Sequence, residues 1–194
     1  MAETLSKFGV PLGGGQGRGG LLALKIKHRF RVRVVNFGPI AGGLDFTQQV
    51  QRASKPKISY DAQDVHSYNS TAYYAGKHKW ESIEIELKDD LSNNISKLVG
   101  HQMQKQLNHL EQTAFAAGIN YKFVTIIETM DGGNDTVVES WTLEGCFLEN
   151  ITFSELDYSE SGFQTIQLSI RYDNATMGDG LMTALPEQIP GSRI

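Results

Sequence analysis

The sequence predicts a mainly β fold: an antiparallel β-barrel or sandwich with a single flanking α-helix. Runs in which apolar and polar residues alternate recur along most of the 194-residue chain, as they do in half-buried strands. Only the stretch after Lys88-Asp89-Asp90 places apolar residues three and four apart over several turns, which is the pattern of an amphipathic helix. Because a doubly wound parallel sheet needs several helices, one helix among strands favours an antiparallel fold whose open edge or end the helix covers.

The first expected strand follows an N-terminal arm, residues 1–21. Residues 13–20 are mostly glycine, and glycine loses the most backbone entropy on ordering, so the arm is not expected to form a helix or a strand. Residues 22–34 then alternate apolar side chains with cations, which we call the basic ladder. The basic ladder consists of Lys25, Lys27, Arg29, Arg31 and Arg33. Gly38-Pro39 ends this strand, and a second strand is expected between residues 44 and 54.

Residues 58–78 are expected to form a long loop or a loose hairpin, since they are polar and rich in Tyr and Ser. A strand over residues 82–88 follows, and then a helix over about residues 92–117. Asp90 or Ser92 is placed to cap the start of the helix, and Gly118 to end it. The predicted apolar face of the helix comprises Leu91, Ile95, Leu98, Val99, Met103, Leu107 and Leu110.

Strand patterns return after the helix and complete a single domain over residues 22–176. They cover residues 121–130, 137–148, 151–156 and 163–172, with Asp131-Gly132 at the first turn. A tail that contains prolines follows over residues 177–194. A chain of this length lies in the usual range for one domain.

Composition limits the classes of partner. The net charge of −4 argues against a domain that binds nucleic acid through overall basic charge. Cys146 is the only cysteine, so no intramolecular disulfide forms and a cytosolic compartment is favoured. The N-terminus has no charged leader followed by an apolar core, so no signal peptide is expected. No apolar run approaches the roughly 20 residues of a membrane span, and we expect no membrane partner.

The basic ladder is the strongest charge feature, and two interpretations stand. It could contact phosphates, since Lys and Arg drive affinity for nucleic acid. It could instead pair with acids of a neighbouring strand or subunit, for which Glu84, Glu86 and Glu128 are placed on alternating strands. Aromatic residues for base stacking do not interleave with the ladder. Protein–protein or intramolecular pairing is therefore the favoured interpretation.

No catalytic, cofactor or metal site is expected. Residues 15–20 fit the letters of a dinucleotide-binding fingerprint, but no strand precedes them and no helix follows. The histidines lack metal-site spacing, and Cys146 is expected to be a small buried apolar residue. Asp90 is better explained by the dipole of the following helix than by acid–base chemistry.

Trp80-Glu81-Ser82-Ile83-Glu84-Ile85-Glu86-Leu87-Lys88-Asp89-Asp90, followed by the helix, resembles the tail tube proteins of contractile-tailed bacteriophages. Later segments agree in order and spacing: Tyr121-Lys122-Phe123, Trp141-Thr142-Leu143-Glu144-Gly145-Cys146, and residues 166–172 with Asp173-Asn174-Ala175. The resemblance covers about residues 22–176 and departs at both termini.

This resemblance implies a structural subunit, not an enzyme, that forms six-membered rings stacked into a hollow tube. The implied partners are other copies of the chain, the tail sheath protein, baseplate and tail terminator proteins, and DNA that passes through the lumen without specific binding. The implied location is the virion tail, after assembly in the host cytoplasm. The expected subunit-interface residues are Lys25, Lys27, Arg29, Arg31, Arg33, Glu84 and Glu86. Residues 61–78 and both termini are expected at ring-to-ring contacts, around an acidic or neutral lumen.

Three alternatives stay open. The chain could be a baseplate tube initiator, or the tube of a secretion or injection system, with the same fold. It could also be a monomeric β-barrel module that binds a small ligand or glycan at a concave aromatic site. The candidate aromatic residues for that site are Tyr60, Tyr68, Tyr73 and Tyr74. Polymerisation of the purified protein would distinguish the tube functions from a monomeric ligand-binding module.

Overall fold

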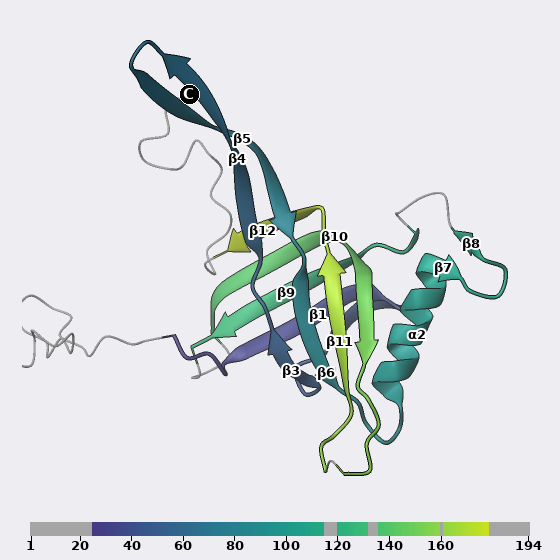
Figure 1. Cartoon of the computed structure of the whole chain (residues 1–194). Coiled ribbons are helices and arrows are strands. Elements are labelled where there is room, and N and C mark those ends of the chain that lie inside the picture. Colours follow the sequence, from purple (N-terminus) through teal and green to yellow (C-terminus); the bar gives the residue numbers. More distant parts are fainter. Residues whose placement is uncertain (1–24, 115–119, 132–135, 160, 179–194) are drawn as a thin grey trace, which may run out of the picture.

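Two layers of antiparallel strands face each other in the computed structural model, which describes residues 25–114, 120–131, 136–159 and 161–178 (Figure 1). One eight-stranded sheet supplies both layers. Its strands are β1 (Phe30–Phe37), β2 (Ile40–Asp45), β3 (Val50–Ala53), β6 (Ile83–Lys88), β9 (Phe123–Met130), β10 (Val137–Phe153), β11 (Thr165–Arg171) and β12 (Asn174–Gly178). The first layer has the order β2-β1-β9-β10-β12 and the second the order β10-β11-β6-β3. The predicted antiparallel β class is confirmed.

Strand β10 passes from the first layer to the second at Gly145. The register of β10 against β9 shifts between Leu143 and Cys146, and such a bulge bends a strand. Gly145 has a φ of 68°, and a Cβ built there would collide with the carboxylate of Asp173. Glycine alone adopts this backbone conformation without strain, so this residue lets one strand serve both layers.

The core fills the space between the layers. Val32 and Val34 on β1 share one buried cluster with inward-facing residues of β6 and β11. Those residues are Ile83, Ile85, Leu87, Ile166, Leu168 and Ile170. Their alternation follows the pleat of each strand, which places every second side chain on the same face. The half-buried strands expected over residues 82–88 and 163–172 are confirmed as β6 and β11.

Helix α2 (Asn94–Gln106) packs on one end of the two layers, beside the β1–β2 turn (Figure 1). Ile95 and Val99 are buried in the core cluster. The Asp90 carboxylate accepts the backbone N–H of Asn94 at 2.8 Å, so Asp90 satisfies a donor at the helix start as predicted. The structure gives Ser92 no such role, since Asn93 occupies the N-cap position.

Two glutamines join α2 to the sheet. Gln102 is fully buried; its Oε1 accepts the N–H of Gly38 at 2.9 Å and its Nε2 donates to the carbonyl of Tyr121 at 2.8 Å. Gln106 binds both the N–H and the C=O of Leu148, as a neighbouring strand would do. The helix therefore satisfies backbone groups at turns and bulges that the strands leave unpaired.

The helix is shorter than predicted. It ends at Gln106, and the chain enters a two-residue pair of strands, β7 (Leu107–Asn108) and β8 (Thr113–Ala114). The side chain of Asn108 accepts the backbone N–H groups of Leu110 and Glu111. Such local bonds compete with the helix. Leu91 and Leu110 are exposed outside the helix, contrary to the predicted apolar face, and Gly118 lies outside the described residues.

Of the two forms expected for residues 58–78, a long loop or a loose hairpin, the structure has a hairpin, and its strands are regular. These residues belong to a long hairpin of β4 (Lys57–Ser67) and β5 (Ser70–Glu81), paired from Lys57↔Glu81 to Ser67↔Ser70. The hairpin projects away from the two layers (Figure 1). Both of its faces are largely exposed, so neither face needs to be apolar and the period-2 pattern of a half-buried strand is missing.

Other predicted boundaries also change. The first strand starts at Phe30, because a turn in which the N–H of Arg29 bonds to the C=O of Ile26 precedes it. The strand expected at residues 44–54 is divided into β2 and β3, and residues 137–148 and 151–156 form the single strand β10. Strand β12 was not predicted, and it includes Met177 and Gly178 of the expected tail. The whole N-terminal arm, and the tail after Gly178, lie outside the described residues. No helix in the described part of the chain is long and apolar enough to cross a membrane.

Candidate functional site

The first layer carries its charges on the face that points away from the core, which we call the outer face. Arg31 and Arg33 alternate on β1 with the buried Val32 and Val34, so the arginines point outward. Arg31 lies opposite Glu128 of β9, and Arg33 lies opposite Asp45 of β2. Strand register alone thus places two cations among two carboxylates.

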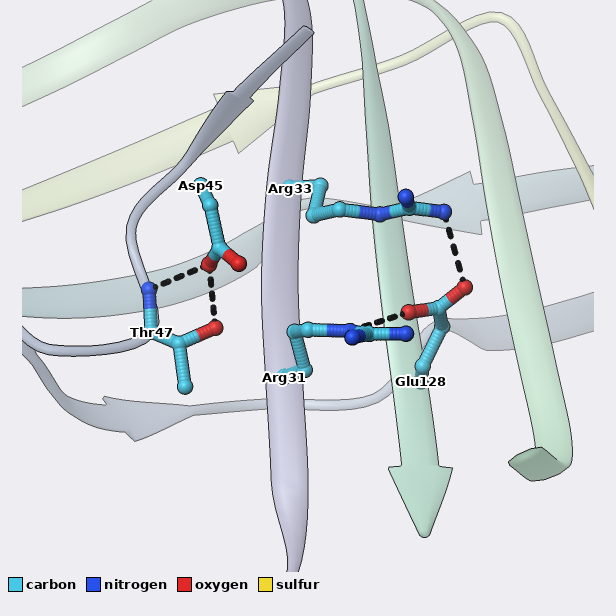
Figure 2. A network of polar contacts seen from close by, with 5 residues as sticks. All are labelled: Arg31, Arg33, Asp45, Thr47 and Glu128. Carbon is cyan, nitrogen blue, oxygen red and sulfur yellow. Dashed lines mark hydrogen bonds and ion pairs between the residues drawn. The ribbon is translucent and has the colours of Figure 1, made fainter. Parts of the chain in front are cut away.

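Glu128 is the centre of this network (Figure 2). Its Oε2 lies 2.7 Å from Nε of Arg31, and its Oε1 lies 3.0 Å from Nη2 of Arg33. The two arginines cover the carboxylate, whose side chain is 8% exposed, while the side chain of Arg33 is 43% exposed. Ion pairs at partly desolvated positions are stronger than fully exposed ones. The outer face therefore presents arginines whose charge is partly neutralised from below.

Asp45 completes the network at the edge of the layer. Its carboxylate accepts the N–H of Thr47 at 2.8 Å and also the Thr47 hydroxyl (Figure 2). Burial raises the pKa of Asp45, but the hydrogen bonds from Thr47 and the charges of Arg31 and Arg33 outweigh it, so the net pKa is lowered. Two arginines and two carboxylates balance each other on this face.

A second cluster lies on the core-facing side around Glu139. Nζ of Lys25, Nζ of Lys55 and Nε1 of Trp141 each lie 2.7 Å from its carboxylate oxygens. The bonds from Lys25 and Lys55 outweigh burial and lower the pKa of Glu139 to about 2. This cluster fixes the segment before β1 and the segment after β3 to the same strand, β10.

A cavity of about 540 Å³ lies beside this cluster, and we call it the cationic cavity. Lys25, Lys27, Arg52 and Lys55 line it, over an apolar floor that includes Phe30 and Ile127. No acidic residue is among its lining residues. Glu139 binds Lys25 and Lys55, whereas Lys27 and Arg52 have no ion pair within the described residues. The cavity therefore carries surplus positive charge.

The residues of the basic ladder do not share one face. Lys25 pairs with Glu139, Arg29 donates to the backbone carbonyl of Asp131, and Lys27 lines the cationic cavity. Arg31 and Arg33 pair with Glu128, an intramolecular pairing of the kind the sequence favoured.

Glu84 and Glu86 instead point outward from β6 in the second layer, and no ion pair joins them to the ladder within the described ranges. Glu139, Lys55 and Gln102 were not predicted. Glu139 and Gln102 are polar residues at core-facing positions, which periodicity alone counts as a break in the pattern, whereas Lys55 is an exposed lysine with no such signal.

Neither a metal site nor an exposed thiol is present among the described residues. There, no group of three or more His, Cys, Asp or Glu is arranged to hold a metal ion. Cys146 is fully buried; burial raises the pKa of its thiol to about 11, and the thiol donates to the carbonyl of Leu143. The prediction that Cys146 is a small buried residue is confirmed.

The predicted aromatic ligand site does not form. Tyr73 and Tyr74 are neighbours on β5 and point to opposite faces of the projecting hairpin. Tyr68 lies at its tip and is 98% exposed. These tyrosines therefore do not converge on one concave surface.

Two strand edges of the first layer are unpaired within the described residues. Strand β2 pairs only with β1, and β12 pairs only with β10. The two edges lie at opposite ends of the same layer. Each edge offers a row of backbone N–H and C=O groups to another strand.

The two-layer sheet with its end-packed helix and projecting hairpin is a tail-tube-like fold. No family model and no curated protein matches the sequence, so the comparison rests on solved structures. A chain of the anti-feeding prophage (AFP) baseplate matches with a TM-score of 0.63 and 16% identity, over 81% of this chain and 97% of that one.

Two further structures agree. A chain of the sheath–tube complex of PVC, an extracellular contractile injection system, in the extended state matches with a TM-score of 0.58 and 16% identity, covering 81% of this chain and 93% of that chain. A chain of the SPP1 tail tube matches with a TM-score of 0.57 and 12% identity, covering 88% of this chain and 87% of that chain. The predicted resemblance to tail tube proteins is confirmed at the level of the fold.

Proposed function

We propose that this chain is a structural subunit of a tail tube and closes into rings through β2 and β12. The observation that carries the proposal is the pair of strand edges, at opposite ends of one layer, that no described strand covers. Two different edges on one subunit make a head-to-tail contact, and such contacts generate a closed ring when the rotation closes. Ring closure also removes the exposed edges, which otherwise favour aggregation.

The ring orients the two faces of each subunit. The second layer and the core cover the inner side of the first layer. The outer face of the first layer is therefore the face that lines the lumen in the proposed ring. Arg31, Arg33, Asp45 and Glu128 then form a charge-balanced lining. Nearly neutral walls let DNA slide without being held, because affinity for phosphates comes from uncompensated cations. The proposed lining is the neutral form of the acidic or neutral lumen expected from the sequence.

The further steps of assembly, from rings to a complete tail, are proposed by analogy with the tail tubes that the chain resembles. Rings are six-membered and stack within a sheath, and baseplate and terminator proteins bind the two ends of the tube. The outward face of the second layer, with Glu84 and Glu86, is then available to the sheath or to neighbouring subunits. Subunits assemble in the host cytoplasm and end in the virion tail. The role is structural and not enzymatic.

A second candidate function has the same fold but conducts a different cargo, protein instead of DNA. The likeness to chains of AFP and PVC particles favours the tube or the tube initiator of an extracellular injection system. A charge-balanced lumen suits protein cargo as well as DNA. The two candidates differ in what co-purifies with native particles, namely DNA or protein effectors.

The test combines electron microscopy with hydrogen exchange. Purified protein should form rings or hollow tubes in negative stain. On assembly, amide exchange should slow in β2 and β12, whose outward N–H groups become bonded, and should stay unchanged in β9, which is paired on both sides in the monomer. A strict monomer with added baseplate seed, or rings without protection of β2 and β12, would contradict the proposed closure.

A further inference from the structure

The cationic cavity lies at the end of the two layers opposite helix α2. Phe30 begins β1 and pairs with Thr129 near the end of β9, and both residues line the cavity. Helix α2 packs at the other end of β1, beside the turn to β2 (Figure 1). The cavity volume of about 540 Å³ is in the range of pockets that hold small organic ligands.

Glu139 holds two lysines of the cavity in place. Nζ of Lys25 and Nζ of Lys55 lie 2.7 Å from different oxygens of its carboxylate. Trp141 donates to the same carboxylate, and the side chain of Glu139 is 8% exposed. An ammonium group has three donors, so each lysine keeps donors for another acceptor while its position is fixed. Such preorganisation lowers the entropic cost of binding a ligand.

The cavity has more positive charge than Glu139 can balance. Lys27 lines it and has no ion pair within the described residues, so three ammonium groups share one carboxylate. Arg52 also lines the cavity, but it lies opposite Glu86 of β6 in the strand register, and it is not counted among these cations. The floor beneath the lysines is apolar and includes Phe30 and Ile127. Cations above an apolar floor favour a ligand with a charged end and an apolar end.

We propose that the cationic cavity binds a small anion with an aromatic body. Its sulfonate, phosphate or carboxylate group lies among Lys25, Lys27 and Lys55, and its ring packs on Phe30, since aromatic rings favour offset or edge-to-face contacts with one another. The site is separate from the tyrosines of the hairpin. The proposal goes beyond the tube function and does not depend on assembly.

A matched pair of dyes separates the charged end from the apolar end. Anilinonaphthalene sulfonate carries a sulfonate on an aromatic body, and phenylnaphthylamine has the same body without the sulfonate. In fluorescence titrations of the monomeric full-length chain, the sulfonate should bind at one site and at least about tenfold more tightly than the uncharged dye. Equal affinity for the two dyes, or no binding of the sulfonate, would overturn the proposal.

A charge reversal places the site on the molecule. Lys27→Glu should weaken binding of anilinonaphthalene sulfonate at least about tenfold. Lys79→Glu is the matched control, because it makes the same change of charge at an exposed residue of β5 outside the cavity. Lys27 has no ion pair to lose among the described residues, so the melting temperatures of both variants should stay close to that of wild type. Wild-type affinity in Lys27→Glu, or an equal loss in both variants, would contradict the assignment.

Lysine footprinting gives an independent location. Bound anilinonaphthalene sulfonate should slow the acetylation of Lys25, Lys27 and Lys55 in the monomeric chain, as measured by mass spectrometry, and should leave Lys79 unchanged. Protection of other lysines in place of these three would overturn the proposal.

The outcomes for the cavity and for the tube are distinct. A chain that binds the dye at these lysines but never forms rings would contradict ring closure alone. A chain that forms rings but fails the dye and footprinting tests would contradict the anion site alone.

Discussion

Gln102 shows how one polar side chain decides the position of the helix. It lies on the apolar stripe of α2, three residues after Val99, and is fully buried. Its amide satisfies the N–H of Gly38 and the C=O of Tyr121, two groups from segments far apart in sequence. Gly38 permits the approach, because a Cβ there would lie 3.1 Å from the carbonyl oxygen of Leu98.

Gln102→Leu should therefore destabilise the monomer by about 2–4 kcal/mol, because two buried backbone groups lose their partners. The measurement is urea unfolding followed by circular dichroism. Gln104→Leu, on the exposed side of the same helix, removes only a solvent-accessible hydrogen bond from the N–H of His109 and should cost less than about 1 kcal/mol. Equal effects of the two substitutions would contradict the role assigned to Gln102.

Glu139 makes the stability of the monomer depend on pH in the acid range. Its pKa is lowered from the ordinary 4.5 to about 2, chiefly by hydrogen bonds from Lys25 and Lys55. A carboxylate with a lowered folded-state pKa contributes fully above the unfolded pKa, and the contribution disappears as pH falls toward the folded pKa.

Glu139→Gln should thus cost about 1–2 kcal/mol at pH 7, a value reduced from the full pKa shift because both lysines are half exposed. The difference from wild type should shrink between pH 4.5 and pH 2. Unfolding free energies measured at pH 7, 4 and 3 check this. A difference in unfolding free energy between wild type and variant that stays constant with pH would show that the substitution removes packing and not a charge interaction.

At the scale of elements, β10 illustrates how one residue joins two layers. The bend at Gly145 needs a positive φ and space beside Asp173. Gly145→Ala should cost at least about 1–2 kcal/mol from backbone conformation alone. Gly162→Ala, where a Cβ meets no atom within 4 Å, is the control.

Thermal unfolding of these variants separates the cost of the positive φ at residue 145 from the cost of the steric collision with Asp173. Adding Asp173→Ala to Gly145→Ala removes the carboxylate and should recover only the part of the loss that is due to collision. Full recovery would mean that the positive φ carries no cost at this position.

The hairpin and the helix end show which elements sequence patterns miss. The strands β4 and β5 are exposed on both faces, so no core selects an alternating pattern in them. The predicted helix continued to residue 117 because Leu107 and Leu110 keep the helical spacing. The side chain of Asn108 ends that segment by binding nearby backbone N–H groups, a local competition that apolar periodicity does not register.

At the scale of the whole molecule, pairing within the subunit changes what the basic ladder does. Glu128 neutralises Arg31 and Arg33 from beneath the outer face. Reversal of Arg31 to Glu would therefore place two carboxylates together and disturb the monomer itself, which makes it a poor probe of assembly.

Glu128→Gln is the sharper probe of the lumen. It leaves two arginines facing a single carboxylate, Asp45, so each subunit gains one uncompensated positive charge on the proposed lining. Tubes of this variant should retain short double-stranded DNA at about 50 mM salt and release it at several hundred millimolar, because phosphate binding weakens steeply with salt. Wild-type tubes should retain little at either salt concentration. Co-sedimentation with labelled DNA measures the difference, and equal retention would contradict a luminal position of Glu128.

The sequence by itself determined the antiparallel β class, the half-buried strands β6 and β11, the buried state of Cys146 and the capping role of Asp90 before the helix that begins at Asn94. Each depends on local periodicity or on a cap within a few residues. Only the tertiary structure decided that β10 serves two layers, that the ladder divides between Glu128 and Glu139, and that β2 and β12 each lack a second partner strand among the described residues. Those features join residues about a hundred positions apart, and pairing at that range depends on register and chain path, which no local pattern encodes.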